Sequence, residues 1–264
     1  EILHVPVGFG LASIENEGFY GGELRADGSI RFENVCFKYS EKAGEYALSD
    51  VDIEIKSGET VGILGGTGSS KTTLIQLIPR LYDVTEGRVL VGGVDVKDYD
   101  LDTLRKEVAV VLQKNVLFSG TIEENLRWGD ENATDEQMFA AAESAQADKF
   151  VKNFTLGYKT ELGQGGVNVS GGQKQRLCIA RALLKEPKII ILDDSTSAVD
   201  TATEAQIRRA FREELAASTK IIIAQRISSV KDADMIVVMD DGKITGVGTH
   251  DYLMENNVEY QEIF

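Results

Sequence analysis

Histidine, cysteine and long apolar runs are scarce in this chain of 264 residues, and each scarcity excludes a class of protein. The two cysteines, Cys36 and Cys178, cannot make a disulfide framework and are expected to be buried apolar side chains. The two histidines, His4 and His250, leave little room for a histidine-rich metal site or a proton relay. No apolar run approaches the roughly 18 residues of a membrane span, and the first residues lack the pattern of a secretory signal.

Basic residues are also in the minority, with 28 Lys and Arg against 43 Asp and Glu, which gives a net charge of −15. Because non-specific nucleic-acid binding requires a basic surface, no nucleic acid is expected as a partner. The hydrophobic fraction of 42% and the charged fraction of 27% are those of an ordinary globular protein. The length predicts one domain, or one domain with a subdomain.

Strand patterns come first along the chain. Residues 30–39 and 48–55 alternate apolar and polar side chains, which is typical of strands. Residues 61–64 form a short buried-strand pattern, and a helical apolar spacing follows over residues 74–81. Further apolar runs occur at residues 189–192, 221–224 and 236–239. Because helical stretches separate these runs, the sequence predicts an α/β fold with a parallel sheet covered by helices on both faces.

Two other segments differ in character. Residues 1–29 are rich in glycine without a clear period and are interpreted as a linker. Residues from about 113 to 185 are helix-rich and polar, and they predict an inserted helical subdomain. The core would then comprise residues 30–112 and 186–264.

A glycine-rich loop follows the strand pattern of residues 61–64. Its sequence, Gly65-Gly66-Thr67-Gly68-Ser69-Ser70-Lys71-Thr72, nearly fits the phosphate-binding pattern G-x-x-x-x-G-K-[ST]. Small residues let backbone N–H groups approach phosphates, Lys71 would reach the terminal phosphates, and the Thr72 hydroxyl would hold Mg²⁺. A glycine-rich turn is the alternative, which the strand pattern before the loop and the helical pattern after it disfavour.

Ser70 is the one departure from this pattern, because it stands where the last glycine is expected. If the backbone there needs a positive φ, serine costs about 1–2 kcal/mol. If the loop needs only close approach, the serine Cβ would crowd the phosphates.

Four further stretches occur in a fixed order along the chain. They are Gln113 after a strand-like run, Val169-Ser170-Gly171-Gly172-Gln173 before a helical run, Asp193-Asp194 after residues 189–192, and Ser197-Ala198-Val199-Asp200. Together with the glycine-rich loop, they resemble the nucleotide-binding domain of ATP-binding cassette (ABC) transporters over nearly all of residues 30–264. The SGGQ stretch is the specific feature, because a phosphate loop alone would also fit kinases and GTPases.

This resemblance implies a fold and an activity. The fold would be a RecA-like P-loop NTPase core with a mostly parallel sheet, an antiparallel β subdomain and an inserted helical subdomain. The activity would be ATP hydrolysis, with ATP and Mg²⁺ as cofactors. Two such domains would sandwich two ATP molecules head to tail, each site taking its phosphate loop from one domain and SGGQ from the other.

The resemblance also implies residue roles. Mg²⁺ would be held by Thr72, Gln113 and Asp193, and the attacking water would be handled by Gln113, Asp194 and Gln225. The nucleotide would be bound by Tyr39, Gly65, Gly66, Thr67, Gly68, Ser69, Ser70, Lys71, Thr72 and Thr73, with Ser170, Gly171, Gly172, Gln173 and Asp200 offered to the partner's ATP. Simpler alternatives stay open: a sheet aromatic for Tyr39, a solvated polar side chain for Gln113, and helix N-caps for Ser170 and Asp200.

Three stretches resemble the multidrug and lipid exporters of this family. They are residues 118–126, residues 160–166 and residues 247–250. In that branch a transmembrane domain precedes the ATPase on the same chain, so residues 1–29 would be a linker from it. The expected partners are therefore a transmembrane domain and a second nucleotide-binding domain, and the expected location is the cytoplasmic face of the cell membrane.

Three positions around the γ-phosphate depart from the family's pattern. Ser70 replaces a glycine, Asp194 stands where the family has a catalytic glutamate, and Gln225 stands where it has a switch histidine. This combination with an intact SGGQ resembles the degenerate-site subunit of heterodimeric exporters, whose own site is slow. The alternatives are a homodimeric ATPase that tolerates the changes, a regulatory subunit with negligible turnover, and a soluble ABC ATPase of repair or translation.

Overall fold

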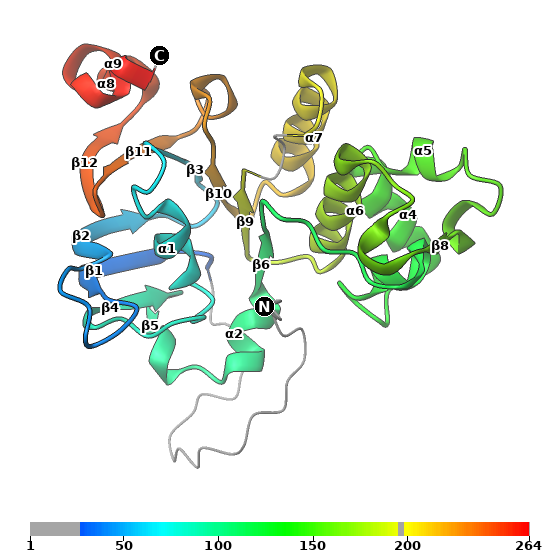
Figure 1. Ribbon diagram of the computed structural model, residues 1–264, viewed down its shortest axis with the longest axis horizontal. Helices are drawn as coiled ribbons and strands as arrows, with labels where there is room; N and C mark the ends of the chain where they lie inside the picture. The colour runs from blue at the N-terminus through cyan, green and yellow to red at the C-terminus, as the bar shows by residue number, and fades with distance from the viewer. Residues whose placement is uncertain (1–26, 195–197, 264) are drawn as a thin grey trace.

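The computed structural model describes residues 27–194 and 198–263, which form two sheets with helices around them and a helical lobe at one side (Figure 1). The larger sheet has six strands, in the order β12 (Lys243–Gly248), β11 (Met235–Asp240), β3 (Thr60–Leu64), β10 (Thr219–Ile223), β9 (Ile189–Asp193) and β6 (Val108–Val111). All neighbours from β11 to β6 are parallel, and β12 alone pairs antiparallel. The predicted parallel α/β sheet is therefore confirmed.

The strands at the centre of this sheet are apolar because they are covered on both faces. All five residues of β9 are buried, as are residues 61–64 of β3. In the view of Figure 1, helices α7 (Thr201–Glu214), α8 (His250–Asn256) and α9 (Val258–Ile263) lie above the sheet, with α1 (Lys71–Gln76) and α2 (Leu101–Glu107) below it. A continuous apolar run, rather than an alternating one, is what two covered faces require.

The smaller sheet has four antiparallel strands. Its order is β2 (Leu48–Ile55), β1 (Ile30–Phe37), β4 (Glu86–Val91) and β5 (Val94–Asp95), followed by the 3₁₀ turn η1 (Val96–Asp98). The alternating side chains of β2 at Leu48, Val51, Ile53 and Ile55 are buried. The strand expected over residues 30–39 ends at Phe37, so Tyr39 lies beyond it.

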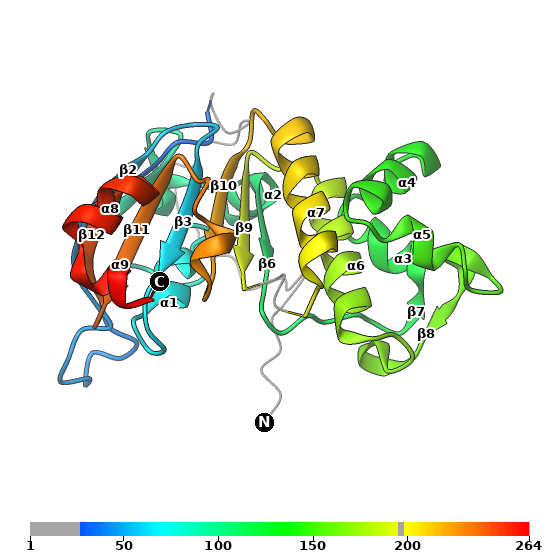
Figure 2. The same cartoon turned by 90° about the horizontal axis from the view of Figure 1, so that it is seen from above.

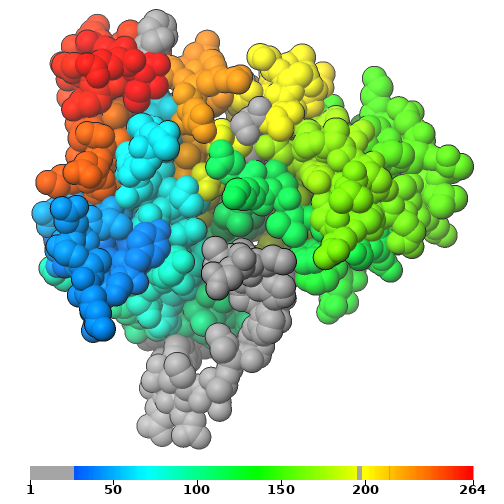
Figure 3. Space-filling model, viewed as in Figure 1, coloured from blue at the N-terminus to red at the C-terminus, as the bar shows by residue number. Residues whose placement is uncertain are grey.

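The segment between β6 and β9 contains most of the helical lobe. Its elements are β7 (Gly120–Thr121), α3 (Ile122–Arg127), α4 (Asp135–Ser144), α5 (Asp148–Val151), η2 (Gly157–Lys159), β8 (Glu161–Leu162), η3 (Gln164–Gly166) and α6 (Gly171–Leu184). Figures 2 and 3 show this lobe at the opposite end of the molecule from β1 and β2. Its apolar core is continuous with residues of the large sheet, including Val111, Ile190 and Leu192. The lobe therefore packs on the sheet rather than around a separate core.

Three helices, α3, α4 and α6, begin with a capping box. The hydroxyls of Thr121, Thr134 and Ser170 each accept a hydrogen bond from the backbone N–H three residues later. The side chains at those later positions, Glu124, Gln137 and Gln173, accept a hydrogen bond from the backbone N–H of the capping residue. The helix predicted over residues 74–81 is shorter, since α1 ends at Gln76. Pro79 explains this difference, because the residue before a proline is disfavoured in the helical region.

The C-terminal helices contain the one histidine that lies within the described residues. His250 begins α8, and its Nδ1 lies 2.8 Å from the hydroxyl of the fully buried Tyr260 in α9. This contact ties α8 to α9, far from the glycine-rich loop (Figure 1). His4 lies outside the described residues, as do all but the last three residues of the predicted linker 1–29. None of the helices in the described part of the chain is long and apolar enough to cross a membrane.

Candidate functional site

The glycine-rich loop connects the end of β3 to the start of α1 and has the backbone of a phosphate cradle. Gly65 has φ +152°, and a Cβ at this position would lie 2.1 Å from the carbonyl oxygen of Met239, so only glycine fits. A Cβ built on Gly66 or Gly68 would meet no described atom within 4 Å. The loop is thus pinned to β11 at its first residue and open above the middle, where phosphates would approach the backbone.

Ser70 adopts the conformation that glycine would take most easily. Its φ of 69° and ψ of 21° are left-handed, and its side chain makes no capping hydrogen bond although it stands at the N-cap of α1. The positive φ considered from the sequence is therefore present, and the cost of about 1–2 kcal/mol applies to this serine.

The Lys71 ammonium lies over its own loop. Its Nζ donates hydrogen bonds to the carbonyl oxygens of Gly65 at 2.8 Å and Gly66 at 2.7 Å, and to the hydroxyl of Ser69 at 3.0 Å. Partial burial lowers the pKa of this ammonium, whereas Asp193 and Asp194 act to raise it. The charge therefore sits at the mouth of the loop, where phosphate oxygens could replace the carbonyls as its partners.

Thr72 and Asp193 form the pair expected at a magnesium site. The Thr72 hydroxyl donates to Oδ2 of Asp193 at 3.1 Å, although 121 residues separate them. Burial raises the pKa of Asp193, and the hydrogen bond from Thr72 opposes that rise. A hydroxyl and a carboxylate are oxygen ligands that suit Mg²⁺, which keeps several waters and also binds substrate phosphates. That sparse ligand set agrees with the lack of any group of three or more His, Cys, Asp or Glu side chains among residues 27–194 and 198–263 that could hold a metal ion alone.

One carboxylate oxygen of Asp194 accepts hydrogen bonds from two side-chain amides. Nε2 of Gln113 donates to Oδ2 of Asp194 at 3.1 Å, and Nε2 of Gln225 donates to the same atom at 2.9 Å. These three residues follow β6, β9 and β10, which are neighbours in the sheet, so parallel strands deliver them to one edge. The backbone of Asp194 is left-handed, with φ 46°, and its N–H donates to the carbonyl of Ile223. Burial raises the pKa of this carboxyl, and the Gln113 hydrogen bond lowers it.

Tyr39 lies beside the phosphate loop rather than in the core. Its side chain is 57% exposed, and its hydroxyl lies 2.8 Å from Oγ1 of Thr73 in α1. The rings of Phe37 and Tyr82 lie nearly perpendicular to it, with centroids 4.9 and 5.3 Å away. An exposed aromatic ring held next to a phosphate loop is suited to stacking on a nucleobase.

The SGGQ stretch, residues 170–173, does not lie next to the glycine-rich loop. Ser170 caps α6, and both Ser170 and Gly171 are exposed. Figures 1 and 2 place α6 across β9 and β6 from α1. Asp200 is likewise a helix cap, since its carboxylate accepts the Thr203 N–H at 3.0 Å, and hydrogen bonds from the side chain and the backbone of Thr203 lower its pKa. The simple capping interpretations of Ser170 and Asp200 are thus present in the structure, while Ser197 lies outside the described residues.

Sequence reasoning missed Gln175 of α6. This polar side chain is 3% exposed, and its Oε1 accepts the backbone N–H of Ala198 at 3.0 Å. The sequence did carry a signal, because Gln175 falls three and four residues before the buried Cys178 and Ile179 and therefore on the apolar face of the helix.

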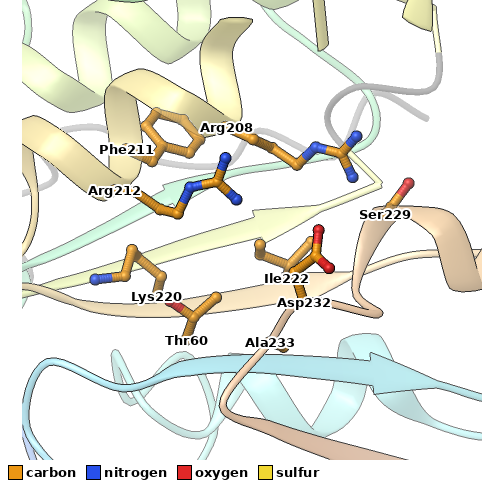
Figure 4. Close-up of a pocket in the computed structure, with 9 residues that line it drawn as sticks. All are labelled: Thr60, Arg208, Phe211, Arg212, Lys220, Ile222, Ser229, Asp232 and Ala233. Carbon is orange, nitrogen blue, oxygen red and sulfur yellow. The ribbon is translucent and has the colours of Figure 1, made fainter. Parts of the chain in front are cut away.

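A separate cavity of about 40 Å³ lies away from the phosphate loop (Figure 4). It lies between α7 and β10, where Arg208, Phe211 and Arg212 stand above Lys220 and Ile222. Its volume suits little more than a water molecule. None of its lining residues belongs to the predicted site, so it is not the place where a nucleotide would bind.

Known proteins match this chain over most of its length. A profile described as "ABC transporter" matches residues 48–197. The chain is 46% identical over 244 residues to a Bacillus subtilis protein named for multidrug export, the ATP-binding/permease protein YgaD, covering 91% of this chain and 42% of that protein. It is 42% identical over 247 residues to the ATP-dependent lipid A-core flippase of Hahella chejuensis, covering 93% and 42%.

A solved structure agrees with these relatives. A bacterial Atm1-family ABC exporter with ATP bound superposes with a TM-score of 0.87 at 37% identity, covering 90% of this chain and 41% of that one. The chain therefore spans about two fifths of the length of these proteins. Both the sequence matches and the fold lead to one conclusion: this chain belongs to the ABC transporter family and is a nucleotide-binding domain of exporter type, an ATP-binding ATPase domain.

Proposed function

We propose that this domain is the ATP-driven motor half of a membrane exporter, whose own ATP site turns over slowly. It pairs head to tail with a second nucleotide-binding domain on a different chain and works beside a transmembrane domain at the cytoplasmic face of the membrane. Exporter relatives support the transport role. The observation that carries the slow turnover is the pair of amides bound to one oxygen of Asp194.

ATP binding at this site uses the loop and Lys71. The triphosphate enters over Gly66 and Gly68, and the Lys71 ammonium exchanges two carbonyl partners for phosphate oxygens. The hydroxyl of Thr72 and the carboxylate of Asp193 would hold Mg²⁺, together with Gln113, whose amide here donates to the neighbouring Asp194. Mg²⁺, when bound, neutralises charge on the phosphate oxygens. Tyr39 leaves Thr73 and stacks on the adenine ring.

Hydrolysis at this site is slow because its proton-handling residues are poorly matched to the task. Asp194 carries the same charge as glutamate but is one methylene shorter, and a misplacement of about 1 Å can reduce a rate roughly a hundredfold. The two amides that donate to Oδ2 occupy the oxygen that would have to accept a proton from the attacking water, and the Gln113 amide opposes the rise in pKa that burial causes. Gln225 can donate to a γ-phosphate but, unlike histidine, cannot take up or release a proton.

The placement of SGGQ supports use by a partner domain. Ser170 and Gly171 are exposed at the start of α6, which lies across β9 and β6 from α1 in Figures 1 and 2. The N-terminus of this 14-residue helix is a favourable place for the γ-phosphate of an ATP bound elsewhere. Head-to-tail pairing would bring the two surfaces together.

The test isolates this chain's own site inside the assembled transporter. Ser170→Arg blocks the partner's site, so the remaining ATPase activity belongs to the loop of this chain. In that background, Asp194→Glu combined with Gln225→His should raise the turnover number at least tenfold, whereas Asp194→Asn should lower the small residual rate. An unchanged rate in the double variant would contradict the proposal. If Asp194→Asn also has no effect, the domain is a regulatory ATP-binding subunit without turnover.

A further inference from the structure

Gln175 connects α6 to the segment that follows β9. Its Oε1 accepts the backbone N–H of Ala198 at 3.0 Å, across 23 residues of sequence. The Gln175 side chain is buried although Ala198 is exposed, so removing the acceptor would release the N–H of Ala198 from its partner in α6. The contact is therefore a local constraint on the segment from Ala198 to Asp200, here called the 198–200 segment.

Gly172 allows the first turn of α6 to approach the backbone of Ala198 closely. A Cβ built at this position would lie 2.8 Å from the carbonyl oxygen of Ala198, and one built at Gly171 would lie 3.7 Å from the Ala198 Cβ. Backbone therefore meets backbone where the first turn of α6 faces the 198–200 segment. A side chain at position 172 would push the two apart.

Arg176, the residue after Gln175, fixes the first turn of α6 on its other side. The guanidinium of Arg176 donates to the carbonyls of Gly172 at 3.2 Å and Gln146 at 2.8 Å and stacks on Phe150 with 4.6 Å to the ring centroid. Asp200 is close enough to raise the pKa of Arg176, against the lowering by burial. The first turn of α6 is thus fixed to the helical lobe on one side and to the 198–200 segment on the other.

We propose that Gln175 is a positioning residue that holds the 198–200 segment against the start of α6, so that Ser170, Gly171 and Asp200 reach the partner domain's ATP as one rigid unit. This inference rests on the proposed head-to-tail pairing. Gln175 itself does not touch the nucleotide; it sets the relative placement of two exposed elements that must meet the same γ-phosphate and the same interface.

The test uses the assembled transporter with this chain and its partner domain. Gln175→Leu keeps the size of the side chain and removes the acceptor. We expect the turnover number of the site formed by the partner's loop and this SGGQ to fall about 10- to 100-fold. The KM for ATP should stay within about twofold, because the loop that binds this ATP belongs to the partner. Cys178→Ala changes the same buried face of α6 without touching Ala198, and it should retain the parent turnover number.

A second substitution separates positioning from general destabilisation. Gly172→Ala should reduce turnover by separating the same two backbones, and its effect combined with Gln175→Leu should be smaller than the product of the two. Photolabelling of this chain's own loop by 8-azido-ATP reports the folded fraction and should be unchanged. An unaltered turnover number, a parallel rise in KM, or effects that multiply would each overturn the role of Gln175. If Ser170→Arg is also fully active, the pairing itself is wrong; if Ser170→Arg is inactive, only the role of Gln175 is lost.

Discussion

The edge formed by the phosphate loop, Asp194 and Gln225 departs from the family pattern at three positions, whereas the start of α6 keeps Ser170, Gly171, Gly172 and Gln173 unchanged. Hydrogen bonds hold the named side chains in place in both regions. The loop edge has hydrogen bonds from Lys71, Thr72, Gln113 and Gln225, and α6 has a complete capping box. Both regions thus have ordered hydrogen bonds, and the departures in one of them concern residues proposed for proton handling and the strained backbone of Ser70. Under the proposed head-to-tail pairing, the surface offered to the partner keeps the expected residues, whereas the domain's own site departs from them.

Blocking the lent surface should have the largest effect. Ser170→Arg places a long cationic side chain where the partner's γ-phosphate would approach, and we expect loss of nearly all ATPase activity of the assembled pair. Steady-state phosphate release measures it. Lys174→Arg in the same helix, which leaves the capping box in place, serves as the control. Normal activity of the Ser170 variant would show that the start of α6 is not used.

Gly65→Ala should nearly abolish ATP binding to this chain's own loop. The added Cβ would lie 2.1 Å from the carbonyl oxygen of Met239, and the φ of +152° excludes alanine without rearrangement. Gly44→Ala is the matched control, since Gly44 lies outside the loop, no described atom lies within 4 Å of its Cβ and its φ is not positive. Photolabelling with 8-azido-ATP, with the start of α6 unaltered, compares the two. Equal labelling of both variants would mean that the loop is not pinned to β11.

The pH dependence of turnover at this chain's own site should change when Gln225 is replaced. Gln225 has no proton to exchange, so this position contributes no inflection between about pH 5 and 8. Gln225→His, in the Ser170→Arg and Asp194→Glu background, should add one near the histidine reference pKa of about 6.5, with the rate rising several-fold as the imidazole becomes neutral. Turnover at saturating ATP from pH 5.5 to 8.5 measures it. An identical profile with glutamine would place the rate limit elsewhere.

Ser70→Gly should have the smallest effect and the opposite sign. It removes left-handed strain of about 1–2 kcal/mol and adds up to about 1 kcal/mol of unfolded-state entropy, so the free energy of unfolding should rise by about 0.5–1 kcal/mol. Ser69→Gly should lower it, because the buried Ser69 hydroxyl donates to the carbonyl of Gly66. Urea unfolding followed by circular dichroism compares the two variants. Destabilisation by Ser70→Gly would show that the serine side chain contributes more than its strain costs.

The large sheet was predictable because its strands are covered on both faces. The strands β9, β10 and β11 are continuous apolar runs, which differ clearly from the amphipathic segments around them. Because helices separate these runs along the chain, their order predicts that the strands are parallel. The same logic predicts that Gln113, Asp194 and Gln225 meet, since each follows a parallel strand. The sequence does not predict that both amides choose one oxygen of Asp194, because this depends on side-chain rotamers and on the left-handed backbone there.

Irregular segments were predicted less well, for a related reason. The end of α1 at Gln76 and the end of β1 at Phe37 depend on local backbone geometry, which apolar periodicity does not report. The contact between Gln175 and Ala198 joins a helix to a segment without regular structure. No spacing rule places such a segment, so only the buried position of a polar glutamine indicated that it had a partner.

The left-handed Ser70 also affects how often the empty loop opens. Because the net difference between serine and glycine is about 0.5–1 kcal/mol, opened forms of the loop should be roughly 2- to 5-fold more accessible with serine than with glycine. Amide hydrogens of Thr72 and Thr73 should therefore exchange with solvent faster in the nucleotide-free domain than in its Ser70→Gly variant. Bound nucleotide would suppress that exchange in both proteins, so the difference in exchange rates belongs to the interval between product release and the next ATP.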